Sequence, residues 1–272
     1  MKNFAENDSE RYLVPGLARG IAILRLFNAG RKVISAPEMA VELNIPRSTV
    51  FRLASTLCDL GLLKKVEHGQ AFELGMGLLS LGFEYLASLD ISELGRPVVD
   101  RLAEETGCSA HLVLRDGLEV VVVYKAKGPS NLTGALTIGS RLPAHATVLG
   151  RACLADSSLD ELRGLFADRE MPRYTAETPL TPEALHGLIE QDRERGYAIS
   201  DAAFEAGISA VAAPVRDHSR RAVGAVNITL PGKIGDYADL DRLIAAVRDQ
   251  AGHLSNLMAH SRSVPGEYRD VG

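Results

Sequence analysis

Two short helical segments joined by a tight turn lie within residues 35–61, and this pattern constrains the fold more than any other feature of the chain. The first segment follows Ser35, which stands three positions before Glu38 in the spacing of a capping box. The second runs from Pro46 to Gly61 and repeats apolar residues every three or four positions, as one face of a helix does. Together the segments predict a helix-turn-helix whose second helix is the recognition helix.

The flanking segments extend this motif into a winged domain. Before the motif, Leu17, Ile21, Leu24 and Phe27 have the spacing of one helix face, which predicts a further helix. After it, the sequence LLKKVEHGQAFEL predicts two short strands with a turn at residues 68–70. A hairpin directly after a recognition helix is the wing of a winged helix-turn-helix.

The rest of the chain mixes helices and strands. Residues 76–89 form a strongly apolar helical segment that continues to Glu105 with one interruption near Asp90. We expect a linker helix that is apolar because it packs against a partner. Strand pairs are expected within residues 108–127 and 208–230, and helices within 138–156, at 181–195 and near 237–260. The predicted fold class is α+β with a largely antiparallel sheet.

Charge is distributed unevenly along the chain, whose net charge is −5. Residues 11–75 contain nine Lys/Arg and five Asp/Glu, a net charge of +4, so that the remaining residues carry −9. A basic module on an acidic body meets phosphates with one end only, which orients the molecule on DNA. The distribution therefore favours a nucleic-acid partner for the N-terminal module.

Composition argues against several other classes. Hydrophobic content of 46% and charged content of 24% are ordinary for a globular protein, and no apolar run reaches the roughly 18 residues that a membrane span needs. The polar start MKNFAENDSERYLVPG lacks the apolar core of a secretory signal, so we expect a cytoplasmic protein. Cys58, Cys108 and Cys153 lie far apart without metal-ligand spacing, and no disulfide framework, metal or cofactor is expected.

Three segments, in this order, resemble the IclR family of bacterial regulators: LARGIAILRLF…STVFRLASTLCDLGLL, SRLPAHATVLGRACLA and ERGYAISDAAFEAGISAVAAPVRD. The resemblance covers nearly the whole chain. It implies a winged helix-turn-helix, a linker helix and a GAF-like effector-binding domain. It also implies homodimers formed chiefly through the N-terminal region and linker helix, with further pairing into tetramers in many members. FELGMGLLSLGFEYLASLDISELGRPVV and VNITLPGKIGDYADL are most similar to the branch that includes regulators of aromatic-acid catabolism, of the PcaR and PobR type.

The chain departs from the family pattern in two places. Arg151 follows Gly150 where many members have lysine, which keeps the positive charge. Ala202 and Ala203 follow Asp201 where many members have two acidic residues. The second difference removes carboxylates near the inferred effector site, so the resemblance does not extend to a particular ligand.

The recognition helix supplies the candidate base contacts. Residues near its N-terminus reach base edges in a helix-turn-helix, which nominates Arg47, Ser48, Thr49 and Arg52. Arg47 is the first candidate because arginine bonds bidentately to guanine. Lys64, Lys65 and His68 of the hairpin, together with Arg19 of the first helix, are expected to contact the DNA backbone and add salt-dependent affinity. The alternative for these charges is a solvated surface role.

The resemblance also nominates an effector pocket. The matching positions are Leu142, Ala144, His145, Ala146, Thr147, Asp201, Ile208, Ala210, Asn227 and Thr229. The LPAHATVLG segment joins a turn to a helix start, whose free N–H groups can hold a carboxylate. Asn227 and Thr229 alternate along a strand and therefore project to one face, which indicates a polar ligand group. The alternatives are structural: His145 as a helix cap, Asn227 as a partner for buried backbone, and the apolar positions as core. The expected effector is a small organic acid, aromatic or aliphatic.

A competing class is an enzyme that uses Cys153 or Ser140 with His145 and Asp201 as a hydrolytic set. The chain has no Gly-x-Ser-x-Gly elbow, phosphate loop or dinucleotide fingerprint to support it. A DNA-binding module without a sensor would leave the larger C-terminal part unexplained. We therefore expect a transcriptional regulator that is not an enzyme and that controls a catabolic operon.

The expected organisation is a winged helix-turn-helix over residues 12–75, a linker helix over 76–90, an effector-binding domain over 91–260 and a tail over 261–272. In the expected mechanism a homodimer places two recognition helices in successive major grooves of a roughly palindromic operator. Effector binding then changes the spacing of these helices through the linker helix.

Overall fold

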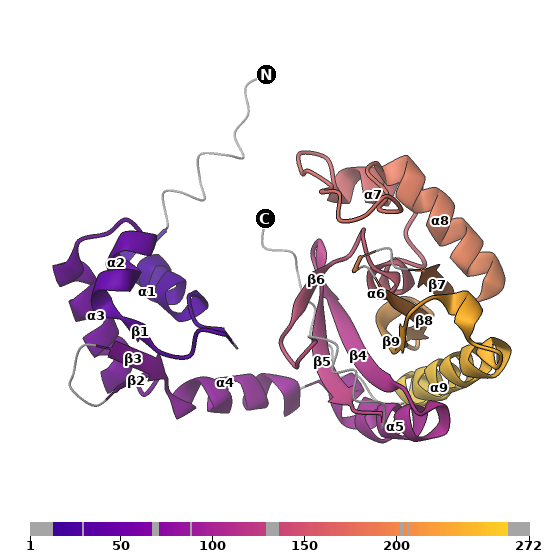
Figure 1. The fold of residues 1–272 in the computed structure, drawn as a ribbon, viewed down its shortest axis with the longest axis horizontal. Coiled ribbons are helices and arrows are strands. Elements are labelled where there is room, and N and C mark those ends of the chain that lie inside the picture. Colours follow the sequence, from indigo (N-terminus) through magenta and orange to yellow (C-terminus); the bar gives the residue numbers. More distant parts are fainter. Residues whose placement is uncertain are drawn as a thin grey trace. The chain divides into compact units, whose positions relative to one another are not determined.

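The computed structural model describes residues 13–28, 30–66, 71–87, 89–128, 136–201, 204–205 and 207–260. The chain divides into two compact units, Met1–Leu86 and Ala87–Gly272, whose elements are labelled in Figure 1. Within the described ranges, no helix is both long enough and apolar enough to cross a membrane.

The N-terminal unit is a helix-turn-helix with a small sheet. Its elements are α1 (Pro15–Arg25), β1 (Ile34–Ser35), α2 (Ala36–Glu42), α3 (Arg47–Asp59), β2 (Leu63–Lys65), β3 (Ala71–Leu74) and α4 (Met76–Ala87). The strands form an antiparallel sheet in the order β1-β3-β2. The predicted helix-turn-helix is confirmed, and the predicted strands after it are β2 and β3. Strand β1 was not predicted because a strand of two residues is too short to show an alternating pattern.

Local sequence accounts for the turn between α2 and α3. The Ser35 N–H donates to Glu38 Oε2 at 2.8 Å and the Glu38 N–H donates to Ser35 Oγ at 3.4 Å, which is the predicted capping box. Asn44 has a φ of 50°, a left-handed conformation that Asn tolerates better than most residues. Pro46 precedes the first turn of α3, so the helix starts one residue later than predicted, at Arg47.

The predicted first helix is α1, and its apolar residues lie on both its exposed and its buried side. Leu17 and Ile21 are 67% and 41% exposed, whereas Ile23 is fully buried in the core of this unit. The core also contains Phe27, Ile34, Met39, Val50, Ala54, Leu57, Leu63 and Phe72. The apolar repeat therefore runs from the exposed Leu17 and Ile21 to the core residue Phe27, and the repeat alone does not show which of its members are buried.

The first turn of α4 is held by the turn that follows α3. The Gly75 N–H donates to the Leu62 carbonyl at 2.8 Å, and the Gly77 N–H donates to the Gly61 carbonyl at 3.0 Å. A Cβ on Gly75 would lie 2.2 Å from the Gly61 oxygen, so only glycine permits this approach. The beginning of the linker helix is thus fixed to the end of the recognition helix.

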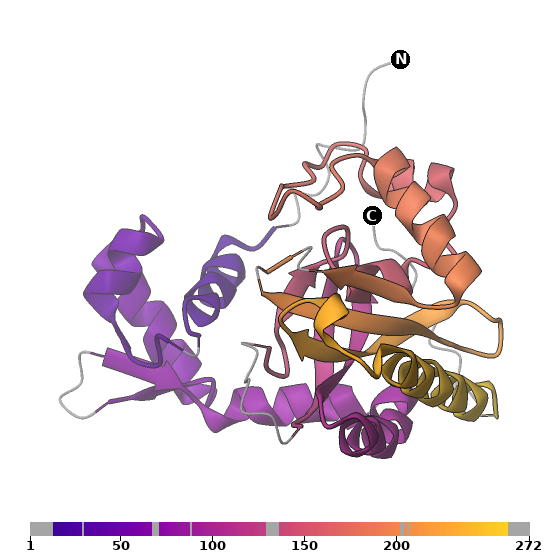
Figure 2. The same cartoon turned by 45° about the vertical axis from the view of Figure 1, so that its right-hand side comes forward.

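The C-terminal unit is an α+β sandwich around one sheet, as predicted. Its elements are α5 (Asp90–Thr106), β4 (Ser109–Asp116), β5 (Glu119–Ala126), β6 (Arg141–Pro143), α6 (Val148–Cys153), α7 (Leu159–Leu165), α8 (Pro182–Arg195), β7 (Ala198–Asp201), β8 (Ile208–Arg216), β9 (Ala222–Pro231), the 3-10 turn η1 (Ile234–Asp236) and α9 (Leu240–His260). The six strands are antiparallel in the order β6-β5-β4-β9-β8-β7. Helices α5 and α9 lie together on one face of this sheet, while α6, α7 and α8 lie on the other (Figures 1 and 2).

Several short elements of this unit were not predicted. Strands β6 and β7 and helix α7 contain three, four and seven residues. The two predicted strand pairs correspond to β4–β5 and β8–β9, and the interruption near Asp90 is the break between α4 and α5. Strands β4, β8 and β9 are buried on both faces over much of their length, so their apolar runs were easier to identify.

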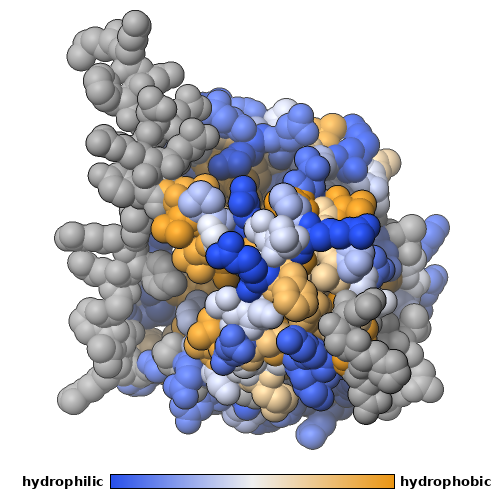
Figure 3. Space-filling view, turned by 90° about the vertical axis from the view of Figure 1, so that its left-hand side faces the viewer, coloured by the Kyte–Doolittle hydropathy of each residue, from blue (hydrophilic) through white to orange (hydrophobic). Residues whose placement is uncertain are grey.

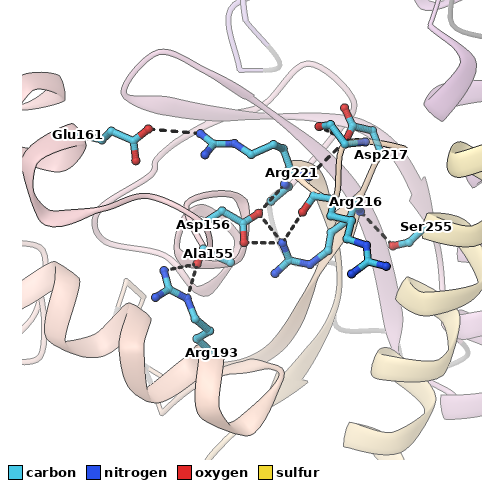
Figure 4. Close-up of polar contacts among 11 residues, drawn as sticks. Ala155, Asp156, Glu161, Arg193, Arg216, Asp217, Arg221 and Ser255 are labelled. Carbon is cyan, nitrogen blue, oxygen red and sulfur yellow. Dashed lines mark hydrogen bonds and ion pairs between the residues drawn. The ribbon is translucent and has the colours of Figure 1, made fainter.

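Arginine contacts fasten the end of α6 to its surroundings (Figure 4). The carboxylate of Asp156, just after α6, accepts hydrogen bonds from the Arg216 guanidinium and, at 2.7 Å, from the Ala222 N–H. Burial by itself raises the pKa of Asp156, but these hydrogen bonds and the charge of Arg216 together lower it below its usual value. Arg193 of α8 donates to the Ala155 carbonyl at 3.0 and 2.8 Å. The loop after α6 is therefore tied to both the β8–β9 hairpin and α8.

Helix α6 lies very close to the turn that precedes it. A Cβ on Gly150 would lie 2.0 Å from the Ala144 carbonyl oxygen and 2.3 Å from the Ala144 Cα. Both are backbone atoms, so no change of side-chain rotamer could relieve the clash. Gly150 therefore sets the distance between α6 and the turn.

The Gly150→Ala substitution is expected to destabilise the C-terminal unit by about 1–3 kcal/mol, because the added methyl group pushes α6 away from the turn. Chemical denaturation followed by circular dichroism measures the change. Gly187→Ala in α8 is the matched control, since a Cβ there meets nothing within 4 Å. It is expected to raise stability by about 0.5–1 kcal/mol. Equal stability of the two variants would contradict the close approach at Gly150.

Candidate effector pocket and DNA-binding surface

A cavity opens in the C-terminal unit between the sheet and the start of α6. Its volume, counted with its open mouth, is about 680 Å³, within the range of roughly 300–1,000 Å³ found for small-molecule sites. Its wall comprises Ser109, His111, Leu136, Leu142, Ala146, Thr147, Val148, Leu149, Ser200, Phe204, Glu205, Ile208, Ala210, Asn227 and Thr229. The cavity brings together seven of the ten predicted effector-site residues: Leu142, Ala146, Thr147, Ile208, Ala210, Asn227 and Thr229.

Strand register determines which side chains form the floor of the cavity. One row crosses four neighbouring strands and consists of Ser109, Thr229, Ala210 and Ser200, each opposite the next. The adjacent row places His111 opposite Asn227. Because alternate residues of a strand face the same side, the two rows form one surface. Three of these strands, β4, β9 and β7, thus contribute hydroxyl, amide and imidazole groups to one floor, and β8 contributes the methyl group of Ala210.

The roof is formed by the first residues of α6. Thr147 is the N-cap of this helix, and its Oγ1 accepts the Gly150 N–H at 3.1 Å and donates to the Pro143 carbonyl at 3.2 Å. The hydroxyl of Thr147 is therefore occupied by structural bonds. The backbone N–H groups in the first turn of a helix have no partner within it. Thr147 takes the Gly150 N–H, so the N–H groups of Val148 and Leu149 are those on this side of the cavity that remain suited to an anion.

His145 lies behind the cavity wall rather than on it. Its Nε2 is 3.0 Å from the Pro172 carbonyl oxygen, and its ring contacts Phe166 edge-on with centroids 6.0 Å apart. Its ring also lies 6.0 Å from Tyr174, which in turn lies 4.9 Å from Phe204 of the wall. His145 therefore positions the loop after α7, a structural role that differs both from the predicted effector contact and from its alternative as a helix cap.

Ala144 and Asp201 also lie beside the cavity. Ala144 is fully buried against Gly150. Asp201 is exposed, and its Oδ1 accepts hydrogen bonds from Ser209 Oγ at 2.7 Å and from the Ile234 N–H at 3.2 Å. The Asp201 carboxylate thus ties the end of β7 to β8 and η1. Ala202 and Ala203, where the chain departs from the family pattern, lie outside the described residues.

The sequence interpretation missed His111, the most buried polar residue of the floor apart from Asn227. His111 is 2% exposed, and its Nδ1 lies 3.1 Å from Asn227 Oδ1. Burial, with a smaller contribution from the charge of Lys125, lowers the pKa of His111 to about 4, against the opposing effect of the bond to Asn227. The ring is therefore neutral at neutral pH. Its signal in the sequence was a lone imidazole within an apolar strand, in CSAHLVL.

Seven other wall residues were missed, five of them on neighbouring strands and loops and two, Val148 and Leu149, in the first turn of α6. These are Ser109, Leu136, Val148, Leu149, Ser200, Phe204 and Glu205. Glu205 is exposed, and none of the wall residues is a lysine or an arginine. An anion in this cavity would consequently be held by N–H and O–H groups rather than by an ion pair.

Four of the candidate DNA contacts lie in the first two turns of α3. Arg47, Ser48 and Arg52 are exposed and Thr49 is half-buried, so the first two turns of α3 present polar groups to solvent. Arg19 is exposed on α1.

The two lysines of the hairpin differ in their surroundings. Lys65 Nζ lies 5.9 Å from the ring centroid of Phe51, an exposed residue of α3, which places this lysine beside the recognition helix. Lys64 Nζ forms an exposed ion pair with Glu73 at 3.1 Å across the hairpin. His68 lies outside the described residues.

The residues of the alternative hydrolytic set have other partners. Cys153 is buried, and burial raises the pKa of its thiol to about 12, which leaves no thiolate at neutral pH. Ser140 Oγ accepts the Thr137 N–H at 2.9 Å, while His145 and Asp201 make the contacts given above. Among the residues with a described placement, no group of three or more His, Cys, Asp and Glu could hold a metal ion.

Known proteins match the chain over most of its length. Residues 83–256 match the profile of the bacterial transcriptional regulator IclR C-terminal domain, and residues 16–67 match the IclR helix-turn-helix domain. The glycerol operon regulatory protein of Streptomyces coelicolor is 32% identical over 254 residues, 92% of this chain and 98% of that protein. The transcriptional regulator XynR of Escherichia coli is 30% identical over 225 residues, 82% of this chain and 89% of that protein.

A solved structure shows the same fold. The crystal structure of an IclR homologue from Microbacterium hydrocarbonoxydans, in complex with 4-hydroxybenzoate, superposes with a TM-score of 0.77. It covers 89% of this chain and 98% of that one at 22% identity. The matched curated proteins are transcriptional regulators and not enzymes. The chain therefore belongs to the IclR family and is a DNA-binding transcriptional regulator.

Proposed function

We propose that this regulator binds a roughly palindromic operator as a homodimer and that a small organic acid in the cavity controls its affinity for DNA. The observation that carries the proposal is the cavity itself, a buried polar floor in a unit joined through α4 to a basic helix-turn-helix. A relative named for the glycerol operon supports a catabolic operon as the target. The proposed location is the cytoplasm, where bacterial DNA lies.

An organic acid suits the chemistry of the wall. Apolar side chains such as Leu142, Leu149 and Ile208 would cover the hydrocarbon part of the ligand. The N–H groups at the start of α6 and the hydroxyls of the floor would hold the carboxylate. The Microbacterium homologue, which shares the fold, holds an aromatic acid.

A dimer would cover apolar surface that a single chain leaves open. On α1, Leu17 and Ile21 are exposed one turn apart. On α4, Met76, Leu79, Leu81 and Tyr85 are 48–75% exposed. Figure 3 shows apolar side chains between hydrophilic ones on the face turned to the viewer. We propose that α1 and α4 form the dimer contact and that dimers pair further into tetramers.

The double substitution Leu17→Glu, Leu81→Glu is expected to convert the dimer into a folded monomer, because it places charges in the apolar contact. Sedimentation velocity measures the mass and circular dichroism checks the fold. Val41→Glu is the matched control, since Val41 is 78% exposed on α2, outside the proposed contact. A monomeric wild type, or a double variant that stays dimeric, would contradict the assignment of α1 and α4.

Arg47→Ala is expected to weaken binding to the operator by about 1–3 kcal/mol and to relax the preference at one base pair, because it removes a base contact. Fluorescence anisotropy against the operator and single-base variants measures both effects. Lys64→Ala should weaken binding to all sequences alike and lower the salt dependence. Arg169→Ala, an exposed arginine of the C-terminal unit, is the control and should change neither. Full sequence preference in Arg47→Ala would rule out Arg47 as a base-reading residue.

The proposed function is tested by a DNA titration at fixed salt with and without a panel of aromatic and aliphatic carboxylates. Fragments upstream of the gene and its neighbours serve as probes. One acid is expected to change the operator affinity by about 5–150-fold, the usual range of allosteric coupling. Ala210→Phe fills the cavity floor and should keep DNA binding while losing this response. Binding that is insensitive to sequence would refute the operator, and an unchanged response in Ala210→Phe would refute the cavity as the sensor.

A further inference from the structure

One atom on the floor of the cavity has an unmet hydrogen-bonding capacity. Within the described residues, three buried side-chain polar atoms have no hydrogen-bond partner: Ser92 Oγ, His111 Nε2 and Gln250 Oε1. Of these residues, His111 alone lies on the cavity wall. A buried polar atom without a partner costs free energy, so it marks a place where a ligand can supply what the protein does not.

The hydrogen bond made by the other ring nitrogen, Nδ1, determines whether Nε2 can donate or accept a hydrogen bond. Nδ1 faces the Asn227 amide oxygen at 3.1 Å, and an amide oxygen is only an acceptor, so Nδ1 carries the hydrogen. A neutral imidazole has one N–H, which leaves Nε2 with a lone pair and no hydrogen. Burial and the nearby positive charge of Lys125 keep the ring in this neutral form.

None of the described residues around His111 forms a hydrogen bond with Nε2. Lys125 lies opposite His111 on β5, but its Nζ donates to the Leu136 carbonyl at 2.6 Å. A carboxylate beside Nε2 would place two acceptors against each other, so the acidic group of an effector must lie elsewhere. The start of α6 contributes Thr147, Val148 and Leu149 to another part of the wall.

We propose that the effector is a hydroxylated organic acid whose hydroxyl group donates a hydrogen bond to His111 Nε2 while its carboxylate lies away from His111. The proposal rests on the proposed function and narrows its ligand class. Asn227 is the positioning residue, because its amide oxygen fixes the hydrogen on Nδ1. An acid without a donor leaves Nε2 buried and unpaired, and the site discriminates against it.

The test uses two sets of matched ligands in isothermal titration calorimetry. The first set is 4-hydroxybenzoate, 4-methoxybenzoate and benzoate, and the second is phenol and anisole. In the wild type, the hydroxyl member of each set is expected to bind about tenfold more tightly than its partners. His111→Phe keeps a flat ring without an acceptor and should bind all members of a set alike. His186→Phe on α8, away from the cavity wall, is the matched control and should keep the wild-type preference.

A second measurement needs no substitution. The ¹⁵N resonance of His111 Nε2 is expected to move when 4-hydroxybenzoate or phenol binds and to stay in place with the methoxy or unsubstituted compounds. Asn227→Asp retains an oxygen acceptor for Nδ1 and should retain the preference for hydroxyl compounds, whereas Asn227→Leu should reduce it. These variants distinguish a positioning role for Asn227 from a role in packing alone.

The two sets separate this inference from the function on which it rests. The role of His111 is overturned if the wild type binds hydroxyl and methoxy compounds with equal affinity. It is also overturned if a folded His111→Phe variant keeps the wild-type preference. Either result leaves the proposal of an acid-controlled regulator in place. A preference for phenol over anisole without binding of any carboxylate supports His111 and overturns the organic acid. Absence of binding by every compound overturns both.

Discussion

The contact of Gly150 with the Ala144 backbone determines where α6 lies, and the effector cavity depends on that position. With no side chain at Gly150, the helix approaches the preceding turn closely enough to form the roof of the cavity. The next residue, Arg151, is 5% exposed and donates to Asp192 at 2.6 Å and to the Ile199 carbonyl at 2.8 Å. Arginine can bond a carboxylate and a carbonyl through different nitrogens of one rigid group, which a lysine cannot do as well. The Arg151 that departs from the family pattern is therefore a buried anchor of α6 and not a ligand group.

The floor of the cavity depends on strand register in the same way. A shift of one residue in β9 would turn Asn227 and Thr229 away from the cavity and bring Val226 and Ile228 into it. The apolar residues Val226 and Ile228 are fully buried, which opposes any such shift. The same constraint holds His111 and Asn227 opposite each other, so the polar pair at the floor results from packing on the far side of the sheet. Packing of the hydrophobic core on one face of the sheet thus holds the polar side chains of the cavity floor in place on the other face.

The features predicted from the sequence were those with local causes. The helix-turn-helix followed from a capping box at Ser35, a proline at 46 and a glycine at 61, all within one short stretch. Thr147 and Ala146 were found through the resemblance and the local signature of a helix start. His111 was missed because its significance comes from Asn227, 116 residues away in the chain and adjacent only in the folded sheet. The exposure of Leu17 and Ile21 on α1 could not be predicted for a related reason, since periodicity shows an apolar face and not what covers it.

Among the described residues, the cavity wall contains no lysine or arginine. Such a wall suits a sensor better than a wall that would form an ion pair with its ligand. A buried ion pair needs geometry that compensates for the desolvation of both charges, and a ligand held that way tends to stay bound. Hydroxyls, N–H groups and one neutral imidazole bind more weakly and with more directional selectivity. An effector shifts an equilibrium only by the difference between its affinities for the two states. Because the first turn of α4 is fixed to the end of α3 through Gly75 and Gly77, we propose that a displacement of α4 makes those two states differ in their fit to DNA.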